Sequence, residues 1–310
     1  MIKETTYEHI SGSDGLKLSV LRIEPEEKEN VRGVVQLVHG MCEHKGRYTD
    51  FMRYLAQNGY ITVIHDHRGH GLSVKDPKDL GYFYEGGYHA LIEDIHEITL
   101  KIKEYAGSDL PFILLGHSMG SLAVRCYIRK YDKELDALCV LGCPSELPGM
   151  DAGMALVQTL KKIKGERAHS HLMDLLVLGI PYDSKFRHEG RFCAWLSTDE
   201  ELINSHNQDP LSMFTFTLNG YENLIRLTKL TYSGGYEAEK PDLPIRFFSG
   251  EDDPCAVSRK DLAKAVGYLK RAGYKNVKAR MYEGMRHEIL NERKRAKVYR
   301  DILEFIQSVS

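Results

Sequence analysis

Residues 116–120 read GHSMG, which fits the pattern G-x-S-x-G, and they lie between an apolar segment and a segment of helical periodicity. In this position the glycines leave room for a sharp turn from strand to helix, with the serine hydroxyl at its tip. A serine hydroxyl is a weak nucleophile, so a base must remove its proton and a carboxylate must orient that base. The pattern predicts nucleophilic catalysis by Ser118; the alternative is a glycine-rich turn with a passive serine.

Two later segments offer the base and the acid. Residues 250–254 read GEDDP after one predicted strand, and residues 284–288 read GMRHE after the next. The order serine, acid, histidine is the one that this strand-turn-helix arrangement uses. We expect His287 to be the base, because it follows the last predicted strand and precedes the last helix. Asp253 is the predicted acid and Asp252 the alternative, since one sequence does not fix a loop to a single residue.

Acyl transfer by a serine also needs two N–H donors that bind the oxyanion. Losing one such donor typically costs about 3 to 4 kcal/mol of barrier. One donor should be the backbone amide of Met119, directly after the nucleophile at a helix N-terminus whose dipole favours an anion. The other should be the amide of Met41, in the loop after the first predicted parallel strand.

The stretch HDHRGHG at residues 65–71 gathers imidazoles and a carboxylate that could suggest a metal site. A strand end followed by two glycines is better explained as a structural turn, in which Asp66 and Arg68 form local hydrogen bonds. We therefore predict no metal and no cofactor.

Several polar and thiol groups lie near the predicted site. Glu43 and Arg47 follow the oxyanion loop, where they either contact a polar substrate head group or form a solvated loop that pairs with itself. Cys42 and Cys255 also lie nearby, but nothing beside them lowers a thiol pKa, so neither is expected to be a nucleophile.

The elements that must position these residues follow from the hydrophobic pattern. Short apolar runs alternate with helical segments from about residue 33 to 145, which indicates a mostly parallel sheet flanked by helices. A hairpin-like pair at the N-terminus, 6–12 and 16–24, predicts antiparallel edge strands. The expected strands are 34–40, 60–66, 111–118, 136–144, 244–250 and 276–284. The expected helices of the core are 47–59, 90–105, 120–131, 258–272 and 289–307.

The alternation stops after Pro144 for about 95 residues of helical periodicity with apolar clusters. We interpret residues 146–231 as an inserted helical cap, and residues 1–145 with 232–310 as the core. The apolar run 171–180 could line an acyl pocket or pack onto the core.

Composition excludes several classes of protein. Lysine and arginine total 42 against 44 acidic residues, a formal charge of −2, so no basic excess exists to bind a nucleic acid. The chain is 42% hydrophobic and 28% charged, as ordinary globular proteins are. The apolar runs are shorter than the roughly 18 residues that cross a bilayer, and the N-terminus does not read as a signal peptide. We expect a cytoplasmic protein without stable membrane insertion. Its six cysteines are too few for a disulfide scaffold and should be reduced.

Taken together, the motifs resemble the α/β-hydrolase superfamily, in its monoglyceride lipase and lysophospholipase branch related to serine aminopeptidases. The matching pieces are VHGMCEHKGRY, HDHRGHGLS, LLGHSMGS, AWLSTDEELINSHNQDPL, FFSGEDDPCAV and GMRHEILNE. The resemblance covers nearly the whole chain but is weak in the first half of the cap. It implies the same catalytic and oxyanion residues as above, and a glycerol-like head group near Glu43 and Arg47.

The leading hypothesis is a cofactor-free serine hydrolase of carboxylic esters, with an acyl chain under the cap and transient contact of the cap with a lipid interface. The alternatives are an amide or peptide hydrolase of the aminopeptidase type and a binding protein that has the fold without the activity. The sequence carries no signal for an oligomeric state.

Overall fold

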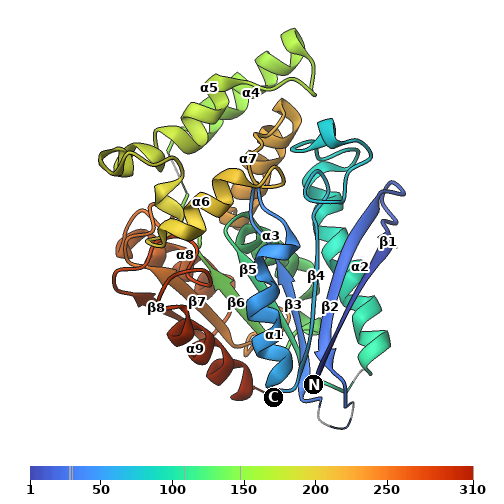
Figure 1. Ribbon diagram of the computed structural model, residues 1–310. Coiled ribbons are helices and arrows are strands. Elements are labelled where there is room, and N and C mark those ends of the chain that lie inside the picture. Colours follow the sequence, from blue (N-terminus) through green and yellow to red (C-terminus); the bar gives the residue numbers. More distant parts are fainter. Residues whose placement is uncertain (28, 30, 108, 147, 310) are drawn as a thin grey trace.

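The computed structural model describes residues 1–310 apart from 28, 30, 108, 147 and 310. These five positions fall within the predicted core and cap ranges and lie outside the described residues. In the described part of the chain, eight strands form one sheet in the order β1-β2-β4-β3-β5-β6-β7-β8 (Figure 1). Their bounds are β1 Ile2–Ile10, β2 Lys17–Pro25, β3 Gly33–Val38, β4 Tyr60–His65, β5 Phe112–His117, β6 Ala137–Leu141, β7 Ile245–Gly250 and β8 Val277–Tyr282.

Pairing within the sheet follows the hydrophobic pattern of each strand. Strands β3 to β6 are buried along their whole length and pair in parallel, as expected for continuous apolar runs covered on both faces. β1 and β2 form the predicted antiparallel pair. β1 is the edge strand, but β2 also pairs with β4 and is therefore not at the edge.

Helices cover both faces of the sheet and enclose a separate apolar cluster on each. α1 (Thr49–Gln57) and α9 (Arg295–Gln307) pack on one face, where Phe51 and Ile302 belong to the same cluster. α2 (Gly87–Ala106), α3 (Met119–Tyr131) and α8 (Arg259–Arg271) pack on the other face. The expected α/β-hydrolase arrangement is confirmed.

The last helix begins later than predicted. The periodicity from Ile289 suggested a helix from that residue, but α9 begins at Arg295. Glu292 explains the difference, because its carboxylate accepts hydrogen bonds from the backbone N–H groups of Arg286 and Thr198. Residues 288–294 are therefore held in turns between the loop that carries His287 and the segment that carries Thr198.

The segment between β6 and β7 is mainly helical and lies over the carboxyl ends of the strands. Figure 1 shows α4 and α5 at the top, with α6 and α7 between them and the sheet. In the described residues, no helix combines the length and the apolar character that crossing a membrane requires. The helices are α4 Met150–Lys164, α5 His171–Asp174, continued by a π turn Leu175–Gly179, α6 Glu200–Gln208 and α7 Leu218–Tyr232; short 3₁₀ turns are Lys45–Tyr48, Pro77–Asp79, Asp132–Glu134, Asp183–Glu189 and Ala194–Leu196.

Candidate active site

Ser118 lies at the tip of the turn from β5 to α3, with φ 52° and ψ −119°. A non-glycine residue in this region is strained by about 1 to 3 kcal/mol, and the surrounding structure must hold it there. The Ser118 N–H donates to the Leu141 carbonyl at 3.0 Å, which ties the turn to β6. A side chain at Gly120 would place its Cβ 2.1 Å from the Val38 carbonyl oxygen, so this position needs glycine.

His287 and Asp253 meet at the ends of β8 and β7. Nδ1 of His287 lies 3.0 Å from both carboxylate oxygens of Asp253, and both residues are buried. The Cys255 N–H donates to Asp253 Oδ1 at 2.8 Å. Burial alone would raise the pKa of Asp253, but the charge and hydrogen bond of His287 outweigh it and lower that pKa. The alternative acid, Asp252, is exposed.

Ser118 and His287 line the same cavity, together with Met41 and Met119. The close packing of loops at this edge depends on small residues: a Cβ at Gly40 would lie 3.0 Å from Ser118 Cβ. Likewise, a Cβ at Gly142 would lie 3.1 Å from His287 Cε1. The structure thus brings the predicted nucleophile and base, 169 positions apart in the sequence, to one site.

The residues of the two predicted oxyanion donors line the same cavity as Ser118. Met119 is the first residue of α3, and Met41 follows β3. Among the backbone hydrogen bonds that the described residues form in turns, loops and helix caps, none has the N–H of Met41 or Met119 as its donor. Both are therefore available to an oxyanion.

Two buried histidines hold the loop that carries Met41. Nδ1 of His39 donates to the Gly40 carbonyl at 2.8 Å, and its Nε2 accepts the N–H of His67 at 2.9 Å. Nε2 of His67 donates back to the His39 carbonyl at 3.1 Å. The HDHRGHG stretch thus supports the loop that carries Met41, a role that the sequence did not reveal.

The same stretch is not a cluster of metal ligands. In the described residues, the one group of at least three histidine, cysteine or acidic side chains that is compact enough to hold an ion is Asp253, Cys255 and His287. The expected local hydrogen bonds are present at Asp66, whose carboxylate accepts the Leu72 N–H at 2.9 Å, and at the Arg68 carbonyl, which accepts from Nδ1 of His70 at 3.1 Å. The Arg68 side chain instead bonds to distant partners. Its fully buried guanidinium needs many acceptors, and it reaches Asp94 at 2.8 Å and Asp14 at 3.0 Å.

Glu43 lies at the polar end of the cavity. Its carboxylate accepts the Gly40 N–H and the Tyr48 hydroxyl, the latter at 2.8 Å, and lies 3.2 Å from Nδ1 of His117. Burial alone would raise the pKa of Glu43, but His117 and Arg47 outweigh it and lower that pKa to about 2. Burial alone would lower the pKa of His117, yet Glu43 raises it. The two groups therefore form a buried ion pair.

Arg47 lies behind this pair and does not line the cavity. Its guanidinium donates to Glu288 at 2.5 and 2.7 Å and lies 3.6 Å from Glu43. Arg47 and Glu43 pair with each other, so the loop pairs with itself as in the alternative, but both side chains are less than a tenth exposed and the loop is not solvated. Glu288, which the sequence analysis missed, lines the cavity beside the predicted base.

The inserted segment is tied to the loop that carries His287. Arg286 donates to the carbonyls of Ala194 at 2.6 Å and Ser197 at 3.3 Å, and pairs with Glu189. The Glu288 N–H donates to the Leu196 carbonyl at 2.7 Å. The indole of Trp195 then lies 5.0 Å from the His287 ring, measured between ring centroids, so this part of the segment forms a wall of the site.

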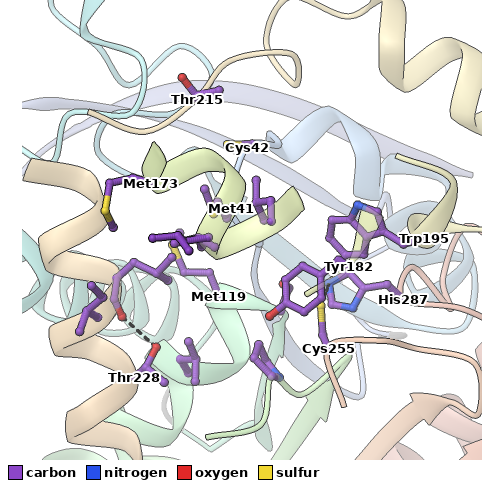
Figure 2. Close-up of a pocket in the computed structure, with 18 of the residues that line it drawn as sticks. Met41, Cys42, Met119, Met173, Tyr182, Trp195, Thr215, Thr228, Cys255 and His287 are labelled. Carbon is purple, nitrogen blue, oxygen red and sulfur yellow. Dashed lines mark hydrogen bonds between the residues drawn. The ribbon is translucent and has the colours of Figure 1, made fainter. Parts of the chain in front are cut away.

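The cavity has a volume of about 870 Å³ and a mainly apolar lining. Figure 2 shows Tyr182, Trp195 and Cys255 beside His287, and Met173 and Thr228 at the other side of the cavity. The part of the cavity lining that comes from α4 and α7, called the apolar arm below, consists of Ala152, Gly153, Leu156, Leu224, Ile225 and Thr228.

Known proteins are similar to this chain over most of its length. The family model described as serine aminopeptidase, S33 matches residues 29–294. A monoacylglycerol lipase of Mycolicibacterium smegmatis is 26% identical over 99% of both chains, and the human monoglyceride lipase is 28% identical over 58% of this chain and 52% of its own. A carboxyl esterase of Bacillus coagulans, solved in complex with glycerol, has a TM-score of 0.86 at 24% identity and covers 99% of this chain and 98% of its own.

These relatives confirm two expectations from the sequence, the monoglyceride lipase-like branch and an enzyme of the carboxylic ester hydrolase class. The solved structure of the carboxyl esterase has the same fold as this chain. This chain therefore belongs to the serine aminopeptidase S33 family of α/β-hydrolases.

Proposed function

We propose that the protein hydrolyses acyl esters through an acyl-enzyme on Ser118, with His287 as base and Asp253 as the acid that orients it. The observation that carries this proposal is the convergence of Ser118 and the His287–Asp253 pair on one apolar cavity. With its Nδ1 proton held by Asp253, the imidazole presents Nε2 as the acceptor for the serine proton.

The reaction follows from this arrangement in two halves. Ser118 Oγ attacks the ester carbonyl while Nε2 of His287 takes its proton, and the amides of Met41 and Met119 bind the oxyanion. The tetrahedral intermediate collapses as His287 protonates the leaving alcohol. Water, deprotonated by the same imidazole, then attacks the acyl-enzyme and releases the fatty acid and Ser118.

A monoacylglycerol or lysophospholipid-type ester is the substrate that this cavity suits. The apolar arm would hold one acyl chain, while the end near Glu43 offers a carboxylate to a polar head group. Relatives named as monoacylglycerol lipase and phospholipase support the same substrate class. Arg47 would act through Glu43 and Glu288, since it does not reach the cavity itself. We propose that residues 146–231 form the cap over the acyl chain.

Labelling and hydrolysis together test this proposal. Wild-type protein should react with a fluorophosphonate probe and hydrolyse monoacylglycerols and a chain-length series of p-nitrophenyl esters. Ser118→Ala should lose both the label and the hydrolysis. Equal labelling of the variant and the wild type would contradict the role of Ser118.

The family description favours one other reaction, cleavage of an amide by an aminopeptidase. That reaction predicts turnover of Pro-β-naphthylamide and little dependence on ester chain length, so the same ester series separates the two. A binding protein without activity would form a tight complex with a monoacylglycerol and turn over no ester in the panel.

We further propose that the cap makes transient contact with a lipid interface, while the cytoplasmic location stays a prediction. Several large apolar side chains on the cap are exposed. Burying apolar area of this kind in a lipid interface favours interfacial binding. Sedimentation with phosphatidylcholine vesicles tests this contact: Leu175→Ser and Leu176→Ser together should reduce binding, and binding equal to wild type would contradict it. The exposed side chains are Ile163, Leu172, Leu175, Leu176, Ile180, Phe192 and Met213.

A further inference from the structure

The thiol of Cys255 faces the proposed catalytic imidazole. Its Sγ lies 4.0 Å from Nε2 of His287, on the side of the ring that must receive the serine proton. Cys255 lines the cavity although it is only 3% exposed, and Figure 2 shows its sulfur beside the His287 ring. The proposed reaction uses the backbone N–H of Cys255, which holds Asp253, and gives its thiol no task.

This thiol is neutral at rest. Burial, and then the charge of Asp253, raise the pKa of Cys255 well above its usual value. Within the described residues, each of the six cysteines is free. A buried, protonated thiol is a poor nucleophile, but a thiophilic cation displaces its proton on binding.

The donor atoms around Cys255 match the preferences of such a cation. One ligand atom each from Asp253, Cys255 and His287 lies within 4.8 Å of the other two, and all three residues are buried. Zn–N and Zn–S bonds of about 2.0 and 2.3 Å together span about 4.3 Å, so an ion fits between two atoms 4.0 Å apart. Sulfur and imidazole ligands select Zn²⁺ and its heavier analogue Cd²⁺ over Mg²⁺ or Ca²⁺.

We propose that Cys255 and His287 form an inhibitory site for a thiophilic divalent cation, beside Asp253, whose carboxylate stays on Nδ1 of the imidazole. On binding, the S–H bond breaks, its proton passes to water, and the metal–sulfur bond forms with no change of oxidation state. The lone pair of His287 Nε2 forms the second bond to the ion. The imidazole then cannot take the proton of Ser118, so hydrolysis stops until a chelator removes the ion. The inhibition rests on the proposed function, whereas the binding of the ion does not.

Inhibition is measured as the fraction of each variant's own metal-free rate, with a p-nitrophenyl ester in buffered free Cd²⁺ or Zn²⁺. Wild type should be inhibited and should recover with EDTA. Cys255→Ser and Cys255→Ala should need at least tenfold more cation for half-inhibition, because a hydroxyl or methyl group is a poor ligand for it. Cys193→Ala, which removes another buried cavity thiol, should behave as wild type.

Binding is followed separately by the ultraviolet charge-transfer absorption of a Cd²⁺–thiolate bond. Ser118→Ala should develop this band, and the double variant Ser118→Ala, Cys255→Ser should not. The band tests the site even if Ser118→Ala hydrolyses esters as well as wild type, which would contradict only the proposed function. Half-inhibition of Cys255→Ser at the wild-type concentration would overturn the inference, as would a band that survives in the double variant.

Discussion

Two adjacent aspartates, Asp252 and Asp253, allow a sharp test of which carboxylate orients the proposed base. Asp253→Asn would present an amide N–H to Nδ1 of His287 and so favour the tautomer with a proton on Nε2, which cannot accept the serine proton. We expect kcat to fall by about 10³- to 10⁴-fold, as in other enzymes with this arrangement. Asp252 is exposed, so Asp252→Asn should stay within about twofold of wild type. A p-nitrophenyl butyrate assay on both variants measures the difference, with thermal unfolding as the control for folding.

Glu43 supports both the oxyanion loop and His117, and its charge matters more than its shape. Glu43→Gln keeps the size of the side chain but leaves His117 and Arg47 with less compensation in a buried site. Breaking a buried ion pair typically costs about 3 to 5 kcal/mol. We expect a loss of this order in urea unfolding, and a fall in kcat of at least tenfold because the Gly40 N–H then faces a neutral amide in place of a carboxylate.

The same substitution at the exposed Glu85 is the control, and it should change neither quantity. Full activity and stability in Glu43→Gln would show that the oxyanion loop does not depend on this charge.

At the scale of residues, the sequence predicted what motifs encode locally and missed what the fold brings together. Ser118, Asp253 and His287 each follow a strand in a recognisable pattern, so their meeting could be anticipated. Glu288 could not be linked to Arg47, because its partner lies 241 positions away and neither residue belongs to a spaced motif.

Helix α4 carries a glycine where it faces α7 across the apolar arm of the cavity. A Cβ at Gly153 would meet Ile225 Cδ1 at 3.7 Å, an ordinary contact, so the position has room for a side chain. We expect Gly153→Leu to fill the arm and shorten the acyl chain that fits. Each methylene of the acyl chain that is displaced from the arm costs about 0.8 kcal/mol of binding free energy. Displacing two or three of them should lower kcat/KM for palmitoyl esters at least tenfold relative to butyryl esters.

Gly153→Ala is the matched control for this prediction. Its single methyl group leaves the arm open, and the helix should gain about 0.5 to 1 kcal/mol from replacing an interior glycine. A folded Gly153→Leu protein with an unchanged chain-length profile would place the acyl chain elsewhere in the cavity.

At the scale of elements, helices buried against the sheet were easier to predict than those of residues 146–231, the proposed cap. The core helices show one apolar face because one face meets the sheet. In the run 171–180 the burial is divided: Met173 is buried, whereas Leu175 and Leu176 are about half exposed. Such a pattern depends on what the cap contacts, which a single sequence does not contain.

For the whole molecule, the class of fold followed from the alternation of strands and helices, but the order of the strands did not. Burial of a strand on both faces explains its apolar run and does not specify its neighbours. The placement of β4 between β2 and β3 is one example. The antiparallel pair β1 and β2 was predictable because a short turn joins the strands locally.

Stability at mildly acidic pH should depend on four buried histidines near the oxyanion loop. Burial, as the largest cause, lowers the pKa of His65 to about 3 and of His70 to about 4, and it holds the pKa of His39 and His67 well below the usual value. In the unfolded chain these groups have a pKa near 6.5. Between about pH 6.5 and 4 the unfolded state therefore binds more protons, and the free energy of unfolding falls as the pH falls.

The variant His70→Phe tests this linkage at one position. The ring of His70 lies among those of Phe83, Phe214 and Phe216, with centroid distances of 5.3 to 5.9 Å. Phenylalanine keeps these ring contacts and loses the hydrogen bond from Nδ1 to the Arg68 carbonyl. Each such histidine contributes up to about 1.4 kcal/mol per pH unit. In urea unfolding from pH 7 to 5, His70→Phe should lose stability less steeply than wild type, whereas a variant at the exposed His171, His171→Gln, should follow wild type. A slope for His70→Phe equal to that of wild type would mean that His70 does not stay neutral in the folded protein.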